Sequence, residues 1–160
     1  MIEKQKITPF LWFDDRAEEA ANHYVSIFKD ATILGVSRYG DAGPGPKGSV
    51  MTVNFRLEGQ EFVALNGGPL FKFTEAVSFM VHCESQKEVD VMWNGLSAGG
   101  EEGPCGWLKD KFGLSWQIVP RVLPQMLTDR DPQKAKRVME AMMRMKKIEI
   151  AELEEAYAGK

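Results

Sequence analysis

The sequence predicts an α+β fold made of two β-α-β-β-β modules, and the order of its hydrophobic patterns is the reason. Residues 7–13 are β-branched and aromatic, an amphipathic helical pattern follows at 16–28, and three strand-like runs lie before residue 67. The same order begins again at residue 76. When the sequence of the first helix is aligned with that of the second, Tyr24 matches Trp93 and Ile27 matches Leu96. Two copies of so long a period indicate a duplicated module and not a solenoid.

The first module is expected at about residues 6–67. After its helix, residues 32–39 form a strand, and residues 49–57 and 60–66 form a hairpin that turns at Glu58-Gly59. The connection at 40–48 is rich in Gly and Pro, and it lacks the spacing of a phosphate-binding loop. We therefore expect it to be a mobile loop over a cleft.

The second module is expected at about residues 75–120. A strand at 76–83 leads to a helix after Glu84-Ser85, a weak strand lies near 101–103, and a hairpin at 105–120 turns at Gly113. The last strand of this hairpin has two different faces. Leu114, Trp116 and Ile118 alternate with Ser115, Gln117 and Val119.

Beyond Pro120 the pattern becomes helical. We expect a short helix at 122–127, a helix at 133–145 that is capped by Asp131-Pro132, and a last helix at 149–157. The paired modules are thus assigned to 1–128 and a helical tail to 129–160. An apolar stripe on the tail is expected to pack as core, over the sheet or across a dimer seam, with an adaptable binding surface as the alternative. The stripe holds Ala135, Val138, Met142 and Met145, and is widened by Met139 and Met143.

Each module would have one sheet face covered by its helix and one bare face. Side by side, the modules would form a partly closed, eight-stranded sheet around a cleft that suits a small ligand. In the second module, Val77, Phe79, Val81 and Cys83 are expected to face the helix. In the first strand we assign the even positions to the cleft, although the shift that aligns the first helix with the second would favour the odd positions. The expected cleft residues are Thr8, Phe10, Trp12, Asn54, Arg56, Ser78, Met80, His82, Trp107, Ser115 and Gln117.

Several of these residues have a second interpretation. His82 could act as a base or hydrogen-bond donor at the cleft rim, or could be an ordinary edge histidine. Arg56 would favour a carboxylate or phosphate on the ligand if it faces the cleft, and would otherwise be solvated. Trp12 and Trp107 are either cleft wall or core packing.

The composition of the 160 residues is that of an ordinary globular protein, with 44% hydrophobic and 27% charged residues. A net charge of -3 without a basic face argues against nucleic acid as a partner. No apolar run is long enough for a membrane span and no signal-type segment follows Met1, so a cytoplasmic protein is expected. Cys83 and Cys105 are expected to be reduced and buried, with a disulfide or nucleophilic role as the alternative.

Four stretches and the tail resemble a known family. They are PFLWFDDRAEEAANHYVSIF, GQEFVALNGGP, AVSFMVHCES, CGWLKDKFGLSWQIVP and the tail segment VMEAMMRMKKIEIAELEEAYAG. They resemble the PhnB-like branch of the vicinal oxygen chelate superfamily, which includes glyoxalase I, extradiol dioxygenases and the fosfomycin and bleomycin resistance proteins. Members of this branch often carry the name 3-demethylubiquinone methyltransferase. No strand of this chain, however, is followed by the Gly-rich nucleotide loop that a methyl-donor site usually uses.

The resemblance also implies where a metal would be held. The ligand positions of the superfamily's metalloenzymes fall on Thr8, Ser78 and Gln117, and less securely on Asn66, which joins the expected cleft residues. Their neutral oxygens are poor ligands for a transition metal. We therefore expect no metal, no cofactor and no assignable catalytic residue, and a homodimer that binds a small organic molecule as bleomycin resistance proteins do. The alternative is an enzyme of the same superfamily that acts on a small organic substrate, with a loosely held divalent metal.

Overall fold

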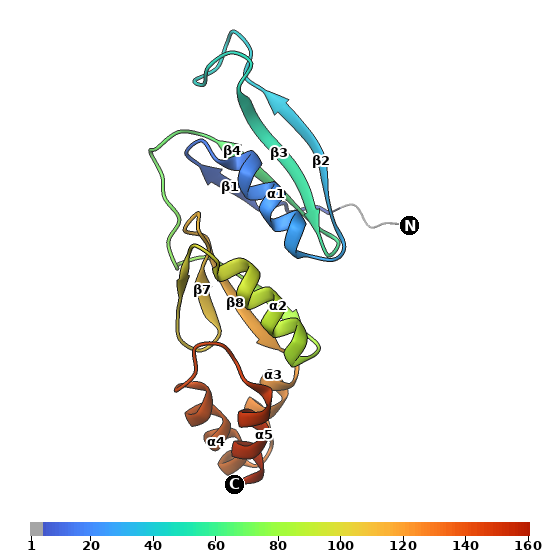
Figure 1. The fold of residues 1–160 in the computed structure, drawn as a ribbon, viewed down its shortest axis with the longest axis vertical. Coiled ribbons are helices and arrows are strands. Elements are labelled where there is room, and N and C mark those ends of the chain that lie inside the picture. The colour runs from blue at the N-terminus through green and yellow to red at the C-terminus, as the bar shows by residue number, and fades with distance from the viewer. Residues whose placement is uncertain (1–4) are drawn as a thin grey trace. The chain divides into compact units, whose positions relative to one another are not determined.

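The computed structural model describes residues 5–160, and the chain divides into two compact units between Phe73 and Thr74. Each unit holds a β-α-β-β-β module in the predicted order, and the second unit carries three more helices (Figure 1). The α+β class is therefore confirmed. The eight strands form two four-stranded mixed sheets, and each sheet lies within one unit.

The first unit contains one four-stranded sheet and one helix. The strand order is β1-β4-β3-β2, with β1 parallel to β4 and the other neighbours antiparallel. The hairpin turns at Glu58 and Gly59, whose φ angles of 47° and 83° are those of a tight two-residue turn. The first strand begins at Phe10, three residues later than expected. The elements are β1 (Phe10–Phe13), α1 (Ala17–Ile27), β2 (Ala31–Arg38), β3 (Val50–Leu57) and β4 (Gln60–Asn66).

Helix α1 covers one face of this sheet. Tyr24 of the helix is fully buried and packs on Phe55 of β3, which stacks on Phe62 of β4 with ring centroids 5.3 Å apart. Leu11 and Phe13 are buried on the same side, as the register of β1 with β4 requires. The even positions of β1 therefore lie on the face without a helix.

The second unit repeats this plan, with strand order β5-β8-β7-β6. Ser85 caps α2, because its hydroxyl accepts a hydrogen bond from the Glu88 amide. One stripe of α2 is apolar and buried, at Val89, Met92, Trp93 and Leu96. The elements are β5 (Ser78–Cys83), α2 (Gln86–Ser97), β6 (Glu101–Glu102), β7 (Trp107–Lys109) and β8 (Ser115–Pro120).

The prediction that Val77 faces the helix of the second module is wrong. Val77 is 63% exposed, because β5 begins only at Ser78 and Val77 lies before the pleat that would direct its side chain. Cys83, at the other end of the same strand, is fully buried as expected.

The turn between β7 and β8 is organised by Asp110, which is 3% exposed. Its Oδ1 accepts hydrogen bonds from the amides of Phe112 and Leu114 at 2.9 and 3.0 Å, and its Oδ2 accepts one from Trp116 Nε1 at 2.9 Å. Gly113 adopts φ 88°, a conformation that favours glycine, as the turn requires. One carboxylate thus fixes both the turn and the indole beneath the sheet.

The C-terminal segment of the second unit is helical, as predicted. Helices α3 (Val122–Leu127), α4 (Pro132–Met142) and α5 (Ile150–Ala158) pack around their own apolar cluster, which also takes in Val119 of β8. Met139 and Met143 were expected to widen this core, but they are 43% and 62% exposed because they face away from the cluster. The buried members are Val119, Leu123, Met126, Val138, Ala141, Met145, Ile148 and Leu153.

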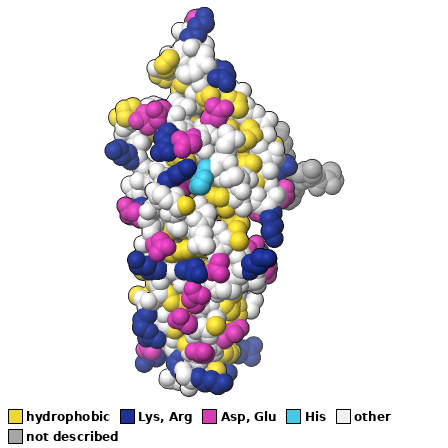
Figure 2. All heavy atoms as spheres, viewed as in Figure 1, with side chains coloured by type: hydrophobic (Ala, Val, Ile, Leu, Met, Phe, Trp, Pro, Cys, Tyr) yellow, Lys and Arg dark blue, Asp and Glu magenta, His cyan; other side chains and the backbone are white. Residues whose placement is uncertain are grey.

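The surface carries both signs of charge. On the face shown in Figure 2, acidic and basic side chains are interleaved and no large field of one sign appears. Among the described helices, none combines the length and the apolar character that crossing a membrane demands.

Candidate functional site

The face of the second sheet that α2 does not cover carries ordered rows of side chains. Glu101 of β6 pairs with Lys109 of β7, Lys109 with Ser115 of β8, and Ser115 with Ser78 of β5. Paired residues on neighbouring strands share a face, so these four side chains form one row across the sheet. We call this surface the helix-free face of the second sheet.

The next row on this face consists of Trp107, Gln117 and Met80. Gln117 links the two rows, because its Nε2 donates a hydrogen bond of 2.9 Å to Ser78 Oγ. The structure therefore brings together Ser78, Met80, Trp107, Ser115 and Gln117, five of the residues predicted for the cleft. His82 is paired with Val119 one row further on and is exposed.

A cavity of about 420 Å³ adjoins the first row. Its wall includes a charged pair, in which Lys109 Nζ lies 2.5 Å from Glu75 Oε1. The hydrogen bond in this pair lowers the pKa of Glu75 and raises the pKa of Lys109, so both groups keep their charge. The lining residues are Glu75, Glu101, Glu102, Gly103, Pro104, Trp107, Leu108, Lys109 and Ser115.

Ser115 is the unusual member of this lining. The residue is 0% exposed, and its Oγ has no hydrogen-bond partner among the described residues. A buried hydroxyl left in this state costs about 1–3 kcal/mol, so native proteins seldom keep one without a reason. Its pairing with Lys109 directs it to the face on which the cavity lies.

The first unit holds the remaining predicted residues on a helix-free face of its own. Phe10 is 59% exposed there, and Asn54 and Arg56 of β3 share that face. Trp12 is half-buried, since its Nε1 donates to the Gly68 carbonyl at 2.9 Å and its ring meets Phe71 edge-on at 5.0 Å. Trp12 is thus partly a packing residue, as one of the two interpretations of its sequence held.

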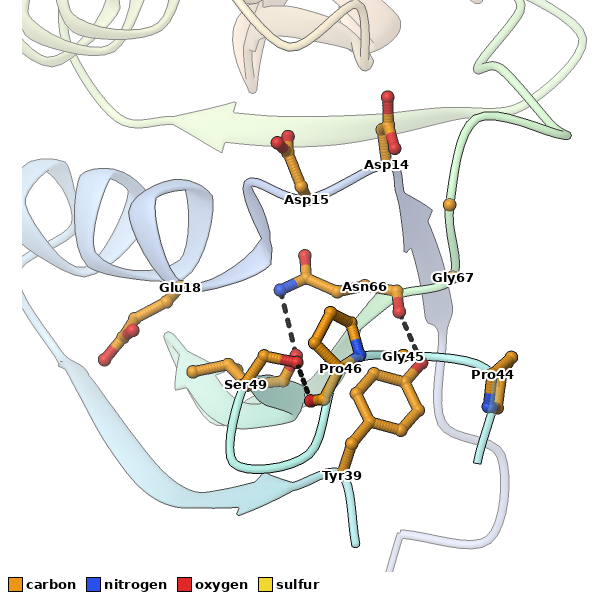
Figure 3. A pocket seen from close by; sticks show the side chains of 12 residues that line it. Asp14, Asp15, Glu18, Tyr39, Pro44, Gly45, Pro46, Ser49, Asn66 and Gly67 are labelled. Carbon is orange, nitrogen blue, oxygen red and sulfur yellow. Dashed lines mark hydrogen bonds between the residues drawn. The ribbon is translucent and has the colours of Figure 1, made fainter. Parts of the chain in front are cut away.

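Thr8 and Asn66 lie outside the pattern expected for them. Thr8 precedes β1 and is exposed. Asn66 ends β4 beside the start of α1, and its Oδ1 accepts a hydrogen bond from the Ala17 amide at 2.8 Å. Its Nδ2 donates to the Val50 carbonyl at 3.1 Å (Figure 3). Because Asn66 pairs with the helix-facing Phe13, its side chain turns to the helix side of the sheet and stabilises the helix N-terminus.

Sequence reasoning missed a second cavity, of about 450 Å³, beside the start of α1 (Figure 3). Tyr39 forms part of its wall and donates a 2.5 Å hydrogen bond to the Asn66 carbonyl. A Cβ on Gly43 would lie 2.8 Å from the Tyr39 ring, and one on Gly45 would lie 2.3 Å from it. The closely spaced glycines of residues 40–48 are the sequence signal that could have indicated this cavity, because they let the loop pack around an aromatic ring.

The metal-ligand positions implied by the resemblance do not suit a divalent cation. Gln117 and Ser78 are hydrogen-bonded to each other, and both polar atoms of the Asn66 side chain are engaged on the helix side. Among the described residues, no group of three or more His, Cys, Asp or Glu side chains is placed to hold a metal. Thr, Ser, Asn and Gln alone form a weak donor set for such an ion.

Comparison with known proteins places these features in a family. A sequence profile described as 3-demethylubiquinone-9 3-methyltransferase matches residues 5–119. Helices α3 to α5 lie beyond this match, so it does not include the tail stretch that contributed to the resemblance. No curated protein matches the chain.

Solved structures give the same result. A PhnB protein from Bacillus cereus is 40% identical with a TM-score of 0.65, and the match covers 72% of this chain and 99% of that one. A protein from Pseudomonas aeruginosa is 21% identical with a TM-score of 0.62, covering 73% and 98%. A fosfomycin resistance protein from Listeria monocytogenes is 14% identical with a TM-score of 0.50, covering 73% and 93%. At this identity the last two show the fold alone. The chain therefore belongs to the PhnB-like, 3-demethylubiquinone-9 3-methyltransferase family.

Proposed function

We propose that this protein binds a small organic molecule on the helix-free face of the second sheet, without a resident metal. The observation that carries the proposal is the buried hydroxyl of Ser115, which has no partner in residues 5–160 and lies beside a cavity of about 420 Å³. Cavities of this size are typical of small-molecule sites, and such sites combine apolar walls with a few convergent polar groups. Trp107 supplies the apolar wall, while Gln117 and Ser78 form an adjacent polar group already fixed by their hydrogen bond.

Ligand-observed NMR of the purified chain with a fragment library would test this proposal. We expect binding that is weakened by Trp107→Leu, which removes the aromatic ring, and by Gln117→Met, which removes the amide while keeping a side chain of similar length. The matched control is Glu140→Gln, on the exposed side of α4. Fragments that bind the two site variants as well as the unchanged chain would contradict the location, and a library without any binder would contradict the function.

Metal dependence is tested separately. The neutral donors at Thr8, Ser78 and Gln117 support a metal-free site. We expect the chain, after equilibration with Zn²⁺, Mn²⁺ or Ni²⁺ and desalting, to retain far less than one metal ion per molecule in elemental analysis. Stoichiometric retention that is lost in Gln117→Ala would overturn the metal-free proposal.

The name of the family favours a second candidate, an enzyme that transfers a methyl group in the same cavity. Calorimetric titration with S-adenosylmethionine distinguishes the candidates. A binding protein for another molecule should give no heat of binding with this donor. Saturable binding that Trp107→Leu abolishes would favour the enzyme.

A homodimer remains our proposal for the assembly. Phe10, Leu34 and Val36 of the first unit are large apolar residues that are 59%, 44% and 45% exposed, and association would cover them. Light scattering coupled to size exclusion should then give twice the monomer mass of 18.0 kDa. A monomeric mass at micromolar concentration would refute this proposal.

A further inference from the structure

We propose that the molecule held in the cavity beside Ser115 is an organic cation with N–H donors, of the arylalkylammonium type, in which an alkyl arm joins an aromatic ring to a protonated amine. This inference rests on the proposed function and adds the chemical class of its ligand. Three independent properties of the lining support it: the balance of charge, the aromatic wall and the unsatisfied hydroxyl.

The charge balance of the cavity is acidic. On the helix-free face its lining contains the carboxylates of Glu75 and Glu101 and the ammonium of Lys109. That ammonium is already bonded to Glu75 at 2.5 Å. Glu102 adds no carboxylate to this face, because it pairs with the buried Leu108 and accepts a hydrogen bond of 3.0 Å from Trp93 Nε1 of α2 on the opposite face. A carboxylate or phosphate ligand would meet this excess of like charge, whereas a cation is attracted by it.

The aromatic wall favours the same class of ligand. Trp107 is half-buried, lines the cavity and lies two residues from Lys109 on the same face. The face of an indole attracts ammonium groups, and it also stacks with a flat ring. A ligand that combines a ring with an ammonium group uses both properties.

Ser115 supplies the directional contact. Its hydroxyl oxygen has two lone pairs and no partner among the described residues, and the residue is 0% exposed. An ammonium carries only donors, so it can satisfy this oxygen, and the carboxylate of Glu101 two strands away in the same row adds a longer-range attraction. A quaternary ammonium would keep the charge but could not make this hydrogen bond.

Four probes that share a benzyl or phenyl ring test the inference by protein-observed NMR of the full chain. They are benzylamine, benzyltrimethylammonium, benzyl alcohol and benzoate, each titrated into the millimolar range. The readouts are the Ser115 amide and the Trp107 indole signals. We expect affinity to fall in that order, with benzylamine about 2- to 5-fold tighter than benzyl alcohol, the effect of one exposed cation–π contact, and no binding of benzoate.

Two variants with opposite expected effects separate electrostatics from damage to the fold. Glu101→Gln should weaken benzylamine binding, while Lys109→Met should strengthen it, because removing that ammonium makes the lining more acidic. Ser115→Ala should bring benzylamine and benzyltrimethylammonium to similar affinities, and Glu140→Gln should change neither. Loss of structure would weaken binding in every variant.

The possible failures are distinguishable. If benzoate binds at these signals as well as benzylamine does, the cation class is wrong while small-molecule binding stands. If no probe shifts them but the fragment library yields a ligand on the helix-free face, the cation class again fails alone. If both experiments find nothing, the inference and the proposed function fall together.

Discussion

Removing the carboxylate of Asp110 should destabilise the second unit more than any other single truncation of an acidic side chain in the described chain. Two of its donors, the Leu114 amide and Trp116 Nε1, belong to residues that are each 2% exposed. An orphaned buried donor costs about 1–3 kcal/mol, so Asp110→Ala should lower the free energy of unfolding by about 2–6 kcal/mol. Small domains are stable by about 5–15 kcal/mol, which makes this a large fraction of the total.

Asp110→Asn should cost less than Asp110→Ala. Its amide keeps one oxygen, which can serve either the two backbone amides or the indole, while its NH₂ group faces the remaining donor. Urea unfolding followed by tryptophan fluorescence is a suitable assay, because three of the four tryptophans lie in the second unit. Asp41→Ala, at a position where the side chain is 84% exposed, is the control and should stay within about 0.5 kcal/mol of the unchanged chain. A loss below about 1 kcal/mol for Asp110→Ala would refute the role assigned to this carboxylate.

Three further predictions concern the rest of the chain. Asn66→Ala should lower the stability of the first unit by about 1–2 kcal/mol in urea unfolding followed by far-UV circular dichroism, as expected when a helix N-terminus loses its side-chain acceptor; an unchanged midpoint would contradict this role. Burial raises the pKa of Cys83 to about 12, so Ellman's reagent at pH 8 should react with Cys105 alone in the native protein and with both thiols in denaturant; two native thiols would refute it. The hydrogen bond from Lys147 lowers the pKa of Asp90 and is the main cause that raises the pKa of Lys147. Lys147→Met should therefore cost up to about 1 kcal/mol at neutral pH, and the difference should vanish as the pH falls through the lowered pKa of Asp90; a pH-independent difference would exclude the ion pair as its cause.

The module order was predictable because it depends on patterns that are local in sequence. Gly113 and the Glu58-Gly59 turn indicate two hairpins. Ser85 and Asp131 are the N-caps of helices that the structure confirms. The strand faces were harder to assign, because the direction of a side chain depends on where the pleat begins. Val77 was assigned to the helix side for this reason, although the strand starts one residue later.

The candidate site was predictable only in part, because its chemistry depends on contacts between distant residues. The alternation around Ser115 and Gln117 indicated a polar face, but nothing local showed that Gln117 bonds to Ser78 while Ser115 Oγ is left without a partner among the described residues. Asn66 was assigned to the cleft through its place in the family pattern. A capping role depends on a helix that starts 49 residues earlier in the chain, at Ala17, and no short pattern reports such a contact.

The helical tail lies beyond the family match and yet supports the cavity wall. The wall includes Gly103 and Pro104, and the next two residues are held by the tail: the Cys105 amide donates to the Met145 carbonyl and the Gly106 amide to the Lys146 carbonyl, each at 2.8 Å. Both adopt positive φ angles, of 57° and 83°. A non-glycine residue rarely takes that conformation without being held in it. The tail therefore provides the partners that keep this loop in place, and the shape of the cavity depends on residues beyond 5–119, the part of the chain that the family profile matches.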